Sequence, residues 1–218
     1  MTILKPPLND PSWLEPLLRH CHIKSYEKNV DFIRQGEAAD TLYYLIEGSV
    51  AAMLDDPEER RDLLLAYLHK GEFIGEMGLF VPQKTRSVVV RTRTKCRVAE
   101  ITYQRLDRLL ETDLKDYAKD FLYSIGLQLS QRLRQTSRKV GHLAFLDVTG
   151  RIARTLLDLC QQPDAITHPD GMQIRITRQE LARNVGCSRE MAGRVLKSLE
   201  EQGLVSAKGK TIVVFGTR

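Results

Sequence analysis

The chain has 218 residues, which is longer than most single domains, and a formal net charge of +5 at pH 7. Residues 1–138 hold 21 Lys and Arg against 20 Asp and Glu, whereas residues 139–218 hold 12 against 8. This shift in charge favours two domains, and it indicates a polyanionic partner for the second.

The N-terminal segment, MTILKPPLNDPSWLEPLL, has prolines and acids where a signal peptide or membrane span needs an apolar core. The sequence therefore predicts a cytoplasmic protein with no membrane partner. Its four cysteines are isolated, without the C-x-x-C spacing of zinc or dithiol sites, so we expect reduced packing thiols. His20 and His22 flank Cys21, but neighbouring residues rarely converge on one ion, and no metal site is predicted.

From Tyr26 to Thr102 the chain has short runs of β-prone residues separated by turn residues at even spacing. TLYYLIEGSVAAML is broken at Glu47-Gly48, and RSVVVRTRT continues the pattern. Even spacing of this kind is typical of an antiparallel sandwich or roll.

After Glu111 apolar residues recur at intervals of three and four up to Val140, and no proline or glycine interrupts residues 127–140. We expect one long helix with an apolar stripe. A roll buries only part of such a stripe, so the remainder is expected to pair with a second copy. The alternative is that the helix packs only on its own sheet.

Residues 141–148 are expected to connect this helix to a second region that starts with the amphipathic helix VTGRIARTLLDLCQQ. PDAITHPDG, residues 163–171, is expected to be a loop because it has two prolines and no apolar period. The last residues, GLVSAKGKTIVVFG, predict a hairpin around Gly209.

Between this loop and the hairpin, two short helical patterns meet at Gly186, which predicts a helix-turn-helix. Thr177 and Ser188 are suited to cap the two helices, and glycine accepts the positive φ of the turn. The second helix would bury Ala192, Val195, Leu196 and Leu199.

The first turns of that second helix carry Arg189, Glu190 and Arg194, directed away from the predicted core. Arg donates two hydrogen bonds to guanine and Glu accepts from cytosine, so these positions are suited to reading base edges in a major groove. A solvated charged face is the alternative, and the order of cap, glycine turn, helix and basic hairpin disfavours it. The expected phosphate contacts are Thr177, Arg178, Ser188, Lys208 and Lys210, and Gln179 completes the DNA-binding set.

A second motif, GEMGLFVPQKTRS, combines Gly75, Glu76, Arg86 and Ser87. A buried phosphate needs a guanidinium, a hydroxyl and free backbone NH groups, while a carboxylate can accept from sugar hydroxyls. The motif therefore suits a nucleotide. A structural Arg-Glu surface pair is the alternative.

These motifs, with TSRKVGHLAFLDVTGRIARTLLDL and VGCSRE, resemble the cyclic AMP receptor protein family of bacterial transcription regulators over nearly the whole chain. The resemblance implies an α+β protein that is not an enzyme and needs no cofactor. Residues 1–142 would form a cyclic-nucleotide-binding β-roll with a long dimerisation helix, and residues 143–218 a winged helix-turn-helix domain.

The resemblance also implies a role for each residue. Gly75 and Glu76 would bind the ribose of cyclic AMP, Arg86 and Ser87 its phosphate, and Thr136 and Ser137 its adenine, with Ser137 contributed across the dimer. The implied ligand-binding set also includes Arg132. The homodimer would read a palindrome of TGTGA-like half-sites, and the loop residues Thr167, His168 and Gly171 would contact RNA polymerase.

Other interpretations stay open. Met191 replaces a threonine and Ala66 a serine of the best-known members. Relatives with similar recognition helices that lack the serine after the arginine respond to cyclic di-GMP, so this ligand and ligand-independent DNA binding are alternatives. A metal-dependent cupin would need more histidines than His69 in its strands. A cyclic-nucleotide subunit of a kinase or channel would have no use for Arg189 and Arg194.

Overall fold

The computed structural model describes residues 10–56, 61–82 and 84–217, and the chain forms two compact units. The first comprises the chain up to Asp55 together with Leu65–Arg134, and the second comprises Asp56–Leu64 together with the chain from Gln135 onward. The predicted boundary between residues 142 and 143 stays a prediction. The prediction that the N-terminal segment is neither a signal peptide nor a membrane span depends in part on residues 1–9, which lie outside the described residues.

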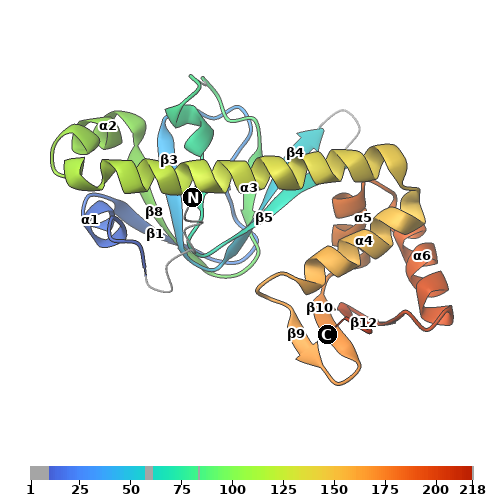
Figure 1. Ribbon diagram of the computed structural model, residues 1–218. Helices are drawn as coiled ribbons and strands as arrows, with labels where there is room; N and C mark the ends of the chain where they lie inside the picture. The colour runs from blue at the N-terminus through green and yellow to red at the C-terminus, as the bar shows by residue number, and fades with distance from the viewer. Residues whose placement is uncertain (1–9, 57–60, 83, 218) are drawn as a thin grey trace. The chain divides into compact units, whose positions relative to one another are not determined.

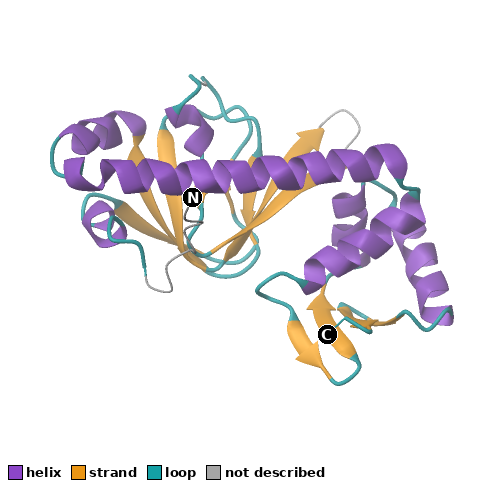
Figure 2. Ribbon diagram, in the orientation of Figure 1, coloured by secondary structure: helices purple, strands orange, loops and turns teal. Residues whose placement is uncertain are grey.

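The strands of the first unit form two sheets (Figure 2). One has the order β1 (His22–Tyr26), β8 (Cys96–Thr102), β3 (Thr41–Glu47), β6 (Phe73–Ile74). The other has the order β2 (Asp31–Ile33), β7 (Val89–Thr92), β4 (Ser49–Asp56), β5 (Arg61–His69). The pairs β1–β8, β3–β8, β3–β6, β2–β7 and β4–β7 are antiparallel, as the sequence predicted for a roll.

Alternating apolar residues place one face of each sheet in the core, as in β3, where Leu42 and Tyr44 are buried. Short helical segments close the unit: α1 (Leu14–Leu18), η1 (Glu76–Leu79), α2 (Tyr103–Glu111) and η2 (Lys115–Tyr117). An aromatic cluster of Trp13, Tyr44, Phe73 and Phe121 joins the first sheet to the helices, with ring centroids 5.0–5.9 Å apart.

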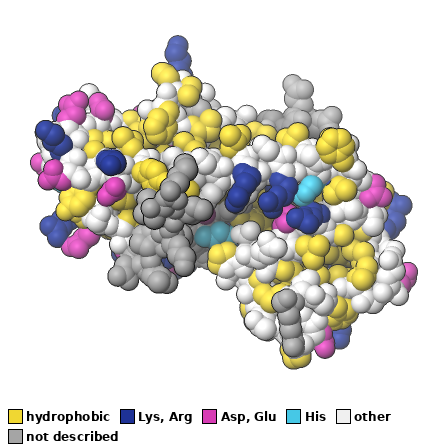
Figure 3. Space-filling model, viewed as in Figure 1, with side chains coloured by type: hydrophobic (Ala, Val, Ile, Leu, Met, Phe, Trp, Pro, Cys, Tyr) yellow, Lys and Arg dark blue, Asp and Glu magenta, His cyan; other side chains and the backbone are white. Residues whose placement is uncertain are grey.

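The long helix α3 spans Ala118–Phe145 (Figure 1). Its N-terminal half buries Phe121, Ile125 and Gln128. Its C-terminal half leaves Leu133 69% and Val140 59% exposed, and hydrophobic side chains reach the surface along this helix in Figure 3. Part of the stripe therefore packs within the chain, and the rest has the exposed apolar character expected of a surface that pairs.

The second unit contains α4 (Val148–Cys160), α5 (Arg178–Val185) and α6 (Arg189–Glu201). They pack on a sheet with the order β11 (Val205–Lys208), β12 (Thr211–Phe215), β10 (Gly171–Arg175), β9 (Ile166–His168). One core joins the three helices to β10, β11 and β12, and its fully buried members include Ile152, Leu156, Leu181, Ala192 and Leu196. This is a helix-turn-helix with a β-hairpin wing, so the predicted α+β fold class is confirmed.

Two local predictions were wrong. Residues 141–148 are not a connector, because α3 continues through Gly141 to Phe145. The chain turns only where Asp147 caps α4, its side chain accepting from Gly150 N at 2.7 Å. Residues 163–171 are not all loop, since Ile166–His168 forms β9 on the edge of the sheet.

Candidate ligand-binding and DNA-binding sites

Arg86 is the centre of the first candidate site. Only 6% of the residue is exposed, although its guanidinium carries a full charge. Its backbone is fixed by Glu37 O, which accepts from Arg86 N at 2.8 Å, and by Gly36 N, which donates to Arg86 O at 2.9 Å. The side chain donates to Thr41 O and, at 3.2 Å, to the hydroxyl of Tyr103.

Gly75 lies directly against this guanidinium. Its φ of +84° is in the left-handed region, and a Cβ there would lie 2.5 Å from Arg86 Nη1 and 2.9 Å from Thr41 O. Tyr103 donates its hydroxyl proton to Gly75 O at 2.6 Å. Burial raises the pKa of Tyr103, and Arg86 opposes this shift, so the phenol stays neutral and can both donate and accept.

Glu76 is 4% exposed and follows Gly75 at the start of η1. Arg132 on α3 donates to Glu76 Oε1 at 2.6 Å and to Phe73 O at 2.7 Å. Glu72 lies 3.5 Å from the same guanidinium. The carboxylate is thus held in place by an arginine from another element.

The electrostatics of this site favour an anion. Within the described residues, the hydrogen-bond acceptors of Arg86 are neutral oxygens, and its guanidinium carbon lies over the Tyr43 ring, 5.6 Å from the centroid. A buried charge without a counter-ion is costly, and an anionic group bound there would compensate it. The structure therefore brings Gly75, Glu76, Arg86 and Arg132 together, as predicted.

The remaining ligand-set residues lie on exposed surface. Ser87 follows Arg86 and is exposed, and Thr136 and Ser137 are exposed on α3. Tyr103 and Thr41 were missed by the sequence analysis, because neither belongs to a local motif with Arg86. The glycine at position 78 is a trace of Tyr103 in the sequence, but only the structure explains it: a Cβ there would lie 2.5 Å from the Tyr103 hydroxyl.

The second candidate site is built on α5 and α6. Thr177 and Glu180 form a capping box at the start of α5: Glu180 N donates to Thr177 Oγ1 at 3.1 Å, and Thr177 N donates to Glu180 Oε2 at 2.8 Å. Gly186 ends the helix with φ +72°. Ser188 then caps α6, accepting from Met191 N at 3.1 Å. Both predicted caps and the predicted turn glycine are confirmed.

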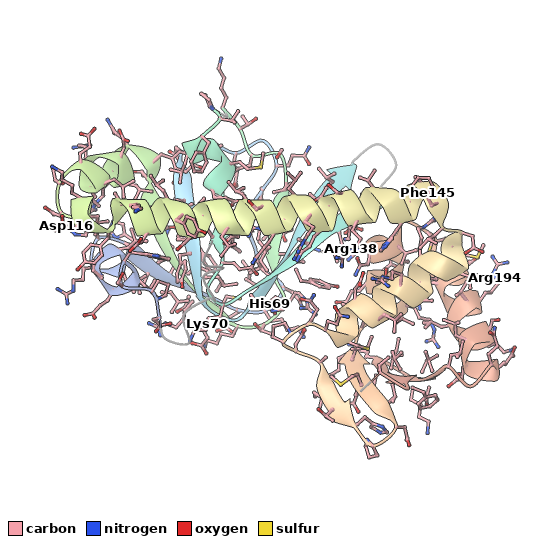
Figure 4. All side chains as sticks on the ribbon, viewed as in Figure 1. His69, Lys70, Asp116, Arg138, Phe145 and Arg194 are labelled. Carbon is pink, nitrogen blue, oxygen red and sulfur yellow. The ribbon has the colours of Figure 1, made fainter. Side chains whose placement is uncertain are left out.

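The exposed face of α6 carries the predicted base-reading residues. Arg189, Glu190 and Arg194 are exposed, and Figure 4 shows Arg194 on the outer side of the helix. On α5, Arg178 and Gln179 are exposed as well, and the Arg178 chain lies over Gly193 of α6. These side chains therefore share one exposed polar surface.

The wing is fixed to α6 by a side chain. Glu200 Oε1 accepts from Ala207 N on β11 at 3.0 Å. Lys208 and Lys210 flank the turn at Gly209 and are exposed. The wing turn thus presents two exposed cationic side chains, which suits contact with phosphates.

The predicted polymerase loop has mixed character. Thr167 is exposed on β9, while His168 Nδ1 accepts from Asp170 N at 3.2 Å. Gly171 is buried in β10, and a Cβ there would collide with Val214 O. Packing alone thus accounts for this glycine, and the polymerase role of the loop stays a prediction.

Across the described residues, no cluster of three His, Cys, Asp or Glu side chains could hold a metal ion, and all four cysteines are free thiols. Among the described helices, none contains an apolar stretch that could span a lipid bilayer.

A β-roll with a buried arginine suited to an anion and a winged helix-turn-helix with an exposed polar face are together typical of one class of protein, the ligand-responsive DNA-binding regulators. Comparison with known proteins agrees. Residues 23–113 match the cyclic nucleotide-binding domain family, and residues 150–215 match the Crp-like helix-turn-helix domain family.

The chain is 55% identical over 216 residues to the cAMP-activated global transcriptional regulator CRP of Escherichia coli O6:H1, covering 99% of this chain and 100% of that protein. It is 56% identical over 208 residues to the cAMP-activated regulator Vfr of Pseudomonas aeruginosa, with 94% of each covered. The solved structure of the c-di-GMP responsive regulator CLP of Xanthomonas campestris is 54% identical with a TM-score of 0.89, covering 94% of this chain and 98% of that one. The chain belongs to the cyclic AMP receptor protein family of transcription regulators. The three relatives named above are transcription regulators and not enzymes.

Proposed function

We propose that this transcription regulator is a homodimer that binds cyclic AMP in each β-roll and then binds palindromic TGTGA-like sites. The observation that carries the proposal is the buried Arg86 guanidinium with neutral partners, beside the left-handed Gly75 and the buried Glu76. A cyclic phosphate supplies the missing negative charge, and ribose hydroxyls are suitable donors to Glu76.

Cyclic AMP is favoured by Ser87, whose exposed hydroxyl follows the arginine and can donate to a phosphate oxygen. Two relatives that are 55% and 56% identical are described as cAMP-activated. The family resemblance assigns the adenine to Thr136 and Ser137 on α3, and it includes Arg132 in the ligand-binding set.

Cyclic di-GMP is the second candidate ligand. It is favoured by the similarity to the Xanthomonas regulator, which is described as c-di-GMP responsive. Both ligands carry phosphodiesters, so Arg86 alone does not discriminate between them.

The DNA-binding role is supported by the exposed α6 face and the basic wing. Arg189, Glu190 and Arg194 would read base edges, while the capped helix ends and Lys210 would contact phosphates. The exposed apolar half of α3 supports the homodimer, and the family supports RNA polymerase as a partner through Thr167, His168 and Gly171. A regulator with these proposed partners would act in the cytoplasm.

The decisive experiment is a calorimetric titration of the purified protein with cyclic AMP, cyclic GMP and cyclic di-GMP, followed by fluorescence anisotropy on a palindromic TGTGA duplex. We expect one saturable cyclic AMP site per chain and DNA binding that tightens when it is filled. Tight operator binding that no cyclic nucleotide changes would instead identify a ligand-independent DNA binder.

A further inference from the structure

Strand β6 is an edge strand, and it leads directly into Gly75 and Glu76 of the candidate ligand site. Its neighbour β3 lies on one side, where Leu45 N donates to Glu72 O at 2.9 Å and Leu45 O accepts from Gly71 N at 2.8 Å. Because backbone groups of successive strand residues point to opposite sides, the N–H and C=O of Phe73 point away from β3. Buried backbone groups need other partners.

Gln128 of α3 supplies them. Its Oε1 accepts from Phe73 N at 2.7 Å, and its Nε2 donates to Phe73 O at 3.0 Å. The Gln128 residue is 9% exposed, so both bonds are shielded from water. The carboxamide therefore pairs with Phe73 as a neighbouring strand residue would, and it ends the sheet.

Arg132 lies one helical turn after Gln128 and extends the same contact. It donates to Phe73 O at 2.7 Å and to Glu76 Oε1 at 2.6 Å. Three hydrogen bonds from α3 thus meet the backbone of Phe73, two residues before Gly75. A displacement of α3 relative to β6 would break them together.

We propose that Gln128 is a positioning residue for the ligand site: by clamping Phe73 it holds Gly75 and Glu76 in the binding geometry and couples their position to α3. This inference rests on the proposed ligand function. Without the clamp, ligand binding would have to order residues 73–76 each time, and this loss of conformational entropy lowers affinity. We therefore expect the loss of Gln128 to weaken ligand binding rather than only the fold.

The test substitutes Gln128→Met, which keeps the side-chain length and removes both hydrogen bonds. Gln131→Met, on the exposed surface of α3, is the matched control. Ile125→Val is a second control, because it removes a buried methylene from the same helix without touching the clamp. Cyclic AMP affinity is measured by calorimetry at a temperature where circular dichroism shows each variant folded.

Amide hydrogen exchange provides a readout that does not depend on the ligand. In Gln128→Met we expect cyclic AMP affinity to fall about tenfold and amides of residues 73–79 to exchange at least tenfold faster. Both controls should leave affinity and this exchange unchanged. If Gln128→Met does not fold, Gln128→Glu, which retains the acceptor for Phe73 N, should show the same changes to a smaller extent.

Unchanged affinity and exchange in Gln128→Met would overturn the proposal, as would equal loss of affinity in Ile125→Val. If the unaltered protein binds no cyclic nucleotide, the proposed function fails, and exchange at residues 73–79 still decides the positioning role. Faster exchange there in Gln128→Met alone would support it, and unchanged exchange would overturn it.

Discussion

At the scale of single residues, burying the Arg86 guanidinium lowers the stability of the fold. A buried guanidinium loses hydration, and neutral carbonyl and phenol oxygens compensate it less well than a carboxylate does. Within the described residues, no carboxylate forms an ion pair with Arg86. Such an arrangement is suited to a residue that is used by a ligand.

Replacing Arg86 with glutamine should therefore separate binding from folding. We expect Arg86→Gln to lower cyclic AMP affinity at least about a hundredfold, since charge-assisted bonds to phosphate are lost, while the melting temperature without ligand does not fall. Calorimetry and thermal unfolding measure the two quantities. Arg97→Gln, at an exposed arginine of β8, should change neither. A large loss of stability in Arg86→Gln would contradict the anion-site interpretation.

Lys139 offers a second test at this scale. Its Nζ donates to Leu64 O at 3.0 Å and to Asn184 Oδ1 at 3.1 Å, within the second unit. Burial lowers the pKa of Lys139 to about 8, and Asp158 opposes this shift. Since the unfolded pKa is about 10.4, the unfolded chain binds more protons between these values, and the cost of burying the charge disappears as pH rises.

We therefore expect the stability of the unaltered protein, relative to Lys139→Met, to increase from pH 7 to pH 10. Urea unfolding at pH 7, 8.5 and 10 measures this difference. The corresponding difference for Lys197→Met, whose side chain is 78% exposed, should stay flat over the same range. A flat difference for Lys139 as well would show that its amine is hydrated in solution.

The ligand-set residues differ in how far local sequence predicts them. Gly75, Glu76 and Arg86 were predicted because they lie in one short stretch with the residue types that a nucleotide requires. Tyr103 and Gln128 were not, because each reaches the site from a distant segment through the tertiary fold. A single Tyr or Gln in a strand or helix pattern has no distinguishing feature, so only the structure shows its partner.

At the scale of elements, the helix-turn-helix depends on its caps. The Thr177 hydroxyl accepts from Glu180 N, and the Thr177 backbone N–H donates to the Glu180 carboxylate. Thr177→Ala should lower the free energy of unfolding by about 1–2 kcal/mol. Thr149→Ala, inside the first turn of α4, removes no cap and is the matched control. Urea unfolding monitored by far-ultraviolet circular dichroism distinguishes the two.

Helices and strands with a strong local sequence pattern were predicted. Those whose formation depends on neighbouring segments were missed. The capped helices and the wing follow from Thr177, Gly186, Ser188 and Gly209. Gly141 was expected to end α3, but the helix continues because one glycine costs only about 1 kcal/mol and its neighbours favour helix. Strand β9 forms although its segment has no alternating pattern, because β10 provides an edge for pairing.

At the scale of the whole molecule, the proposed dimer depends on the exposed half of α3. Leu133 is 69% exposed, and Leu127 and Val140 on the same helix are exposed as well, so a partner would bury several apolar side chains here. Leu133→Asp should shift sedimentation toward the monomer, because a charge would be buried in the pairing surface. Gln131→Asp, two residues earlier and exposed, should leave the assembly unchanged. A wild-type monomer at micromolar concentration would contradict the dimer directly.

A dimer also changes how DNA binding responds to salt. Each neutralised phosphate contributes about 0.9 to the slope of log affinity against log salt, so Lys210→Gln should lower the slope by about 0.9 for one chain and about 1.8 for two. Arg194→Gln should instead cost about 1–3 kcal/mol for each base contact on the palindrome and much less on a scrambled duplex.

Both variants are measured by anisotropy from 50 to 200 mM salt with saturating cyclic AMP, and Lys119→Gln, an exposed lysine on α3, is the charge-matched control. The salt slope reports the number of phosphate contacts, and the difference in affinity between the two duplexes reports the base contacts. The two variants therefore separate phosphate contacts, which position the protein on DNA, from base contacts, which recognise the sequence. A slope change near 0.9 would mean that one chain binds alone. An equal loss for Arg194→Gln on both duplexes would mean that α6 grips the DNA backbone without reading sequence, and the palindrome would then lose its physical basis.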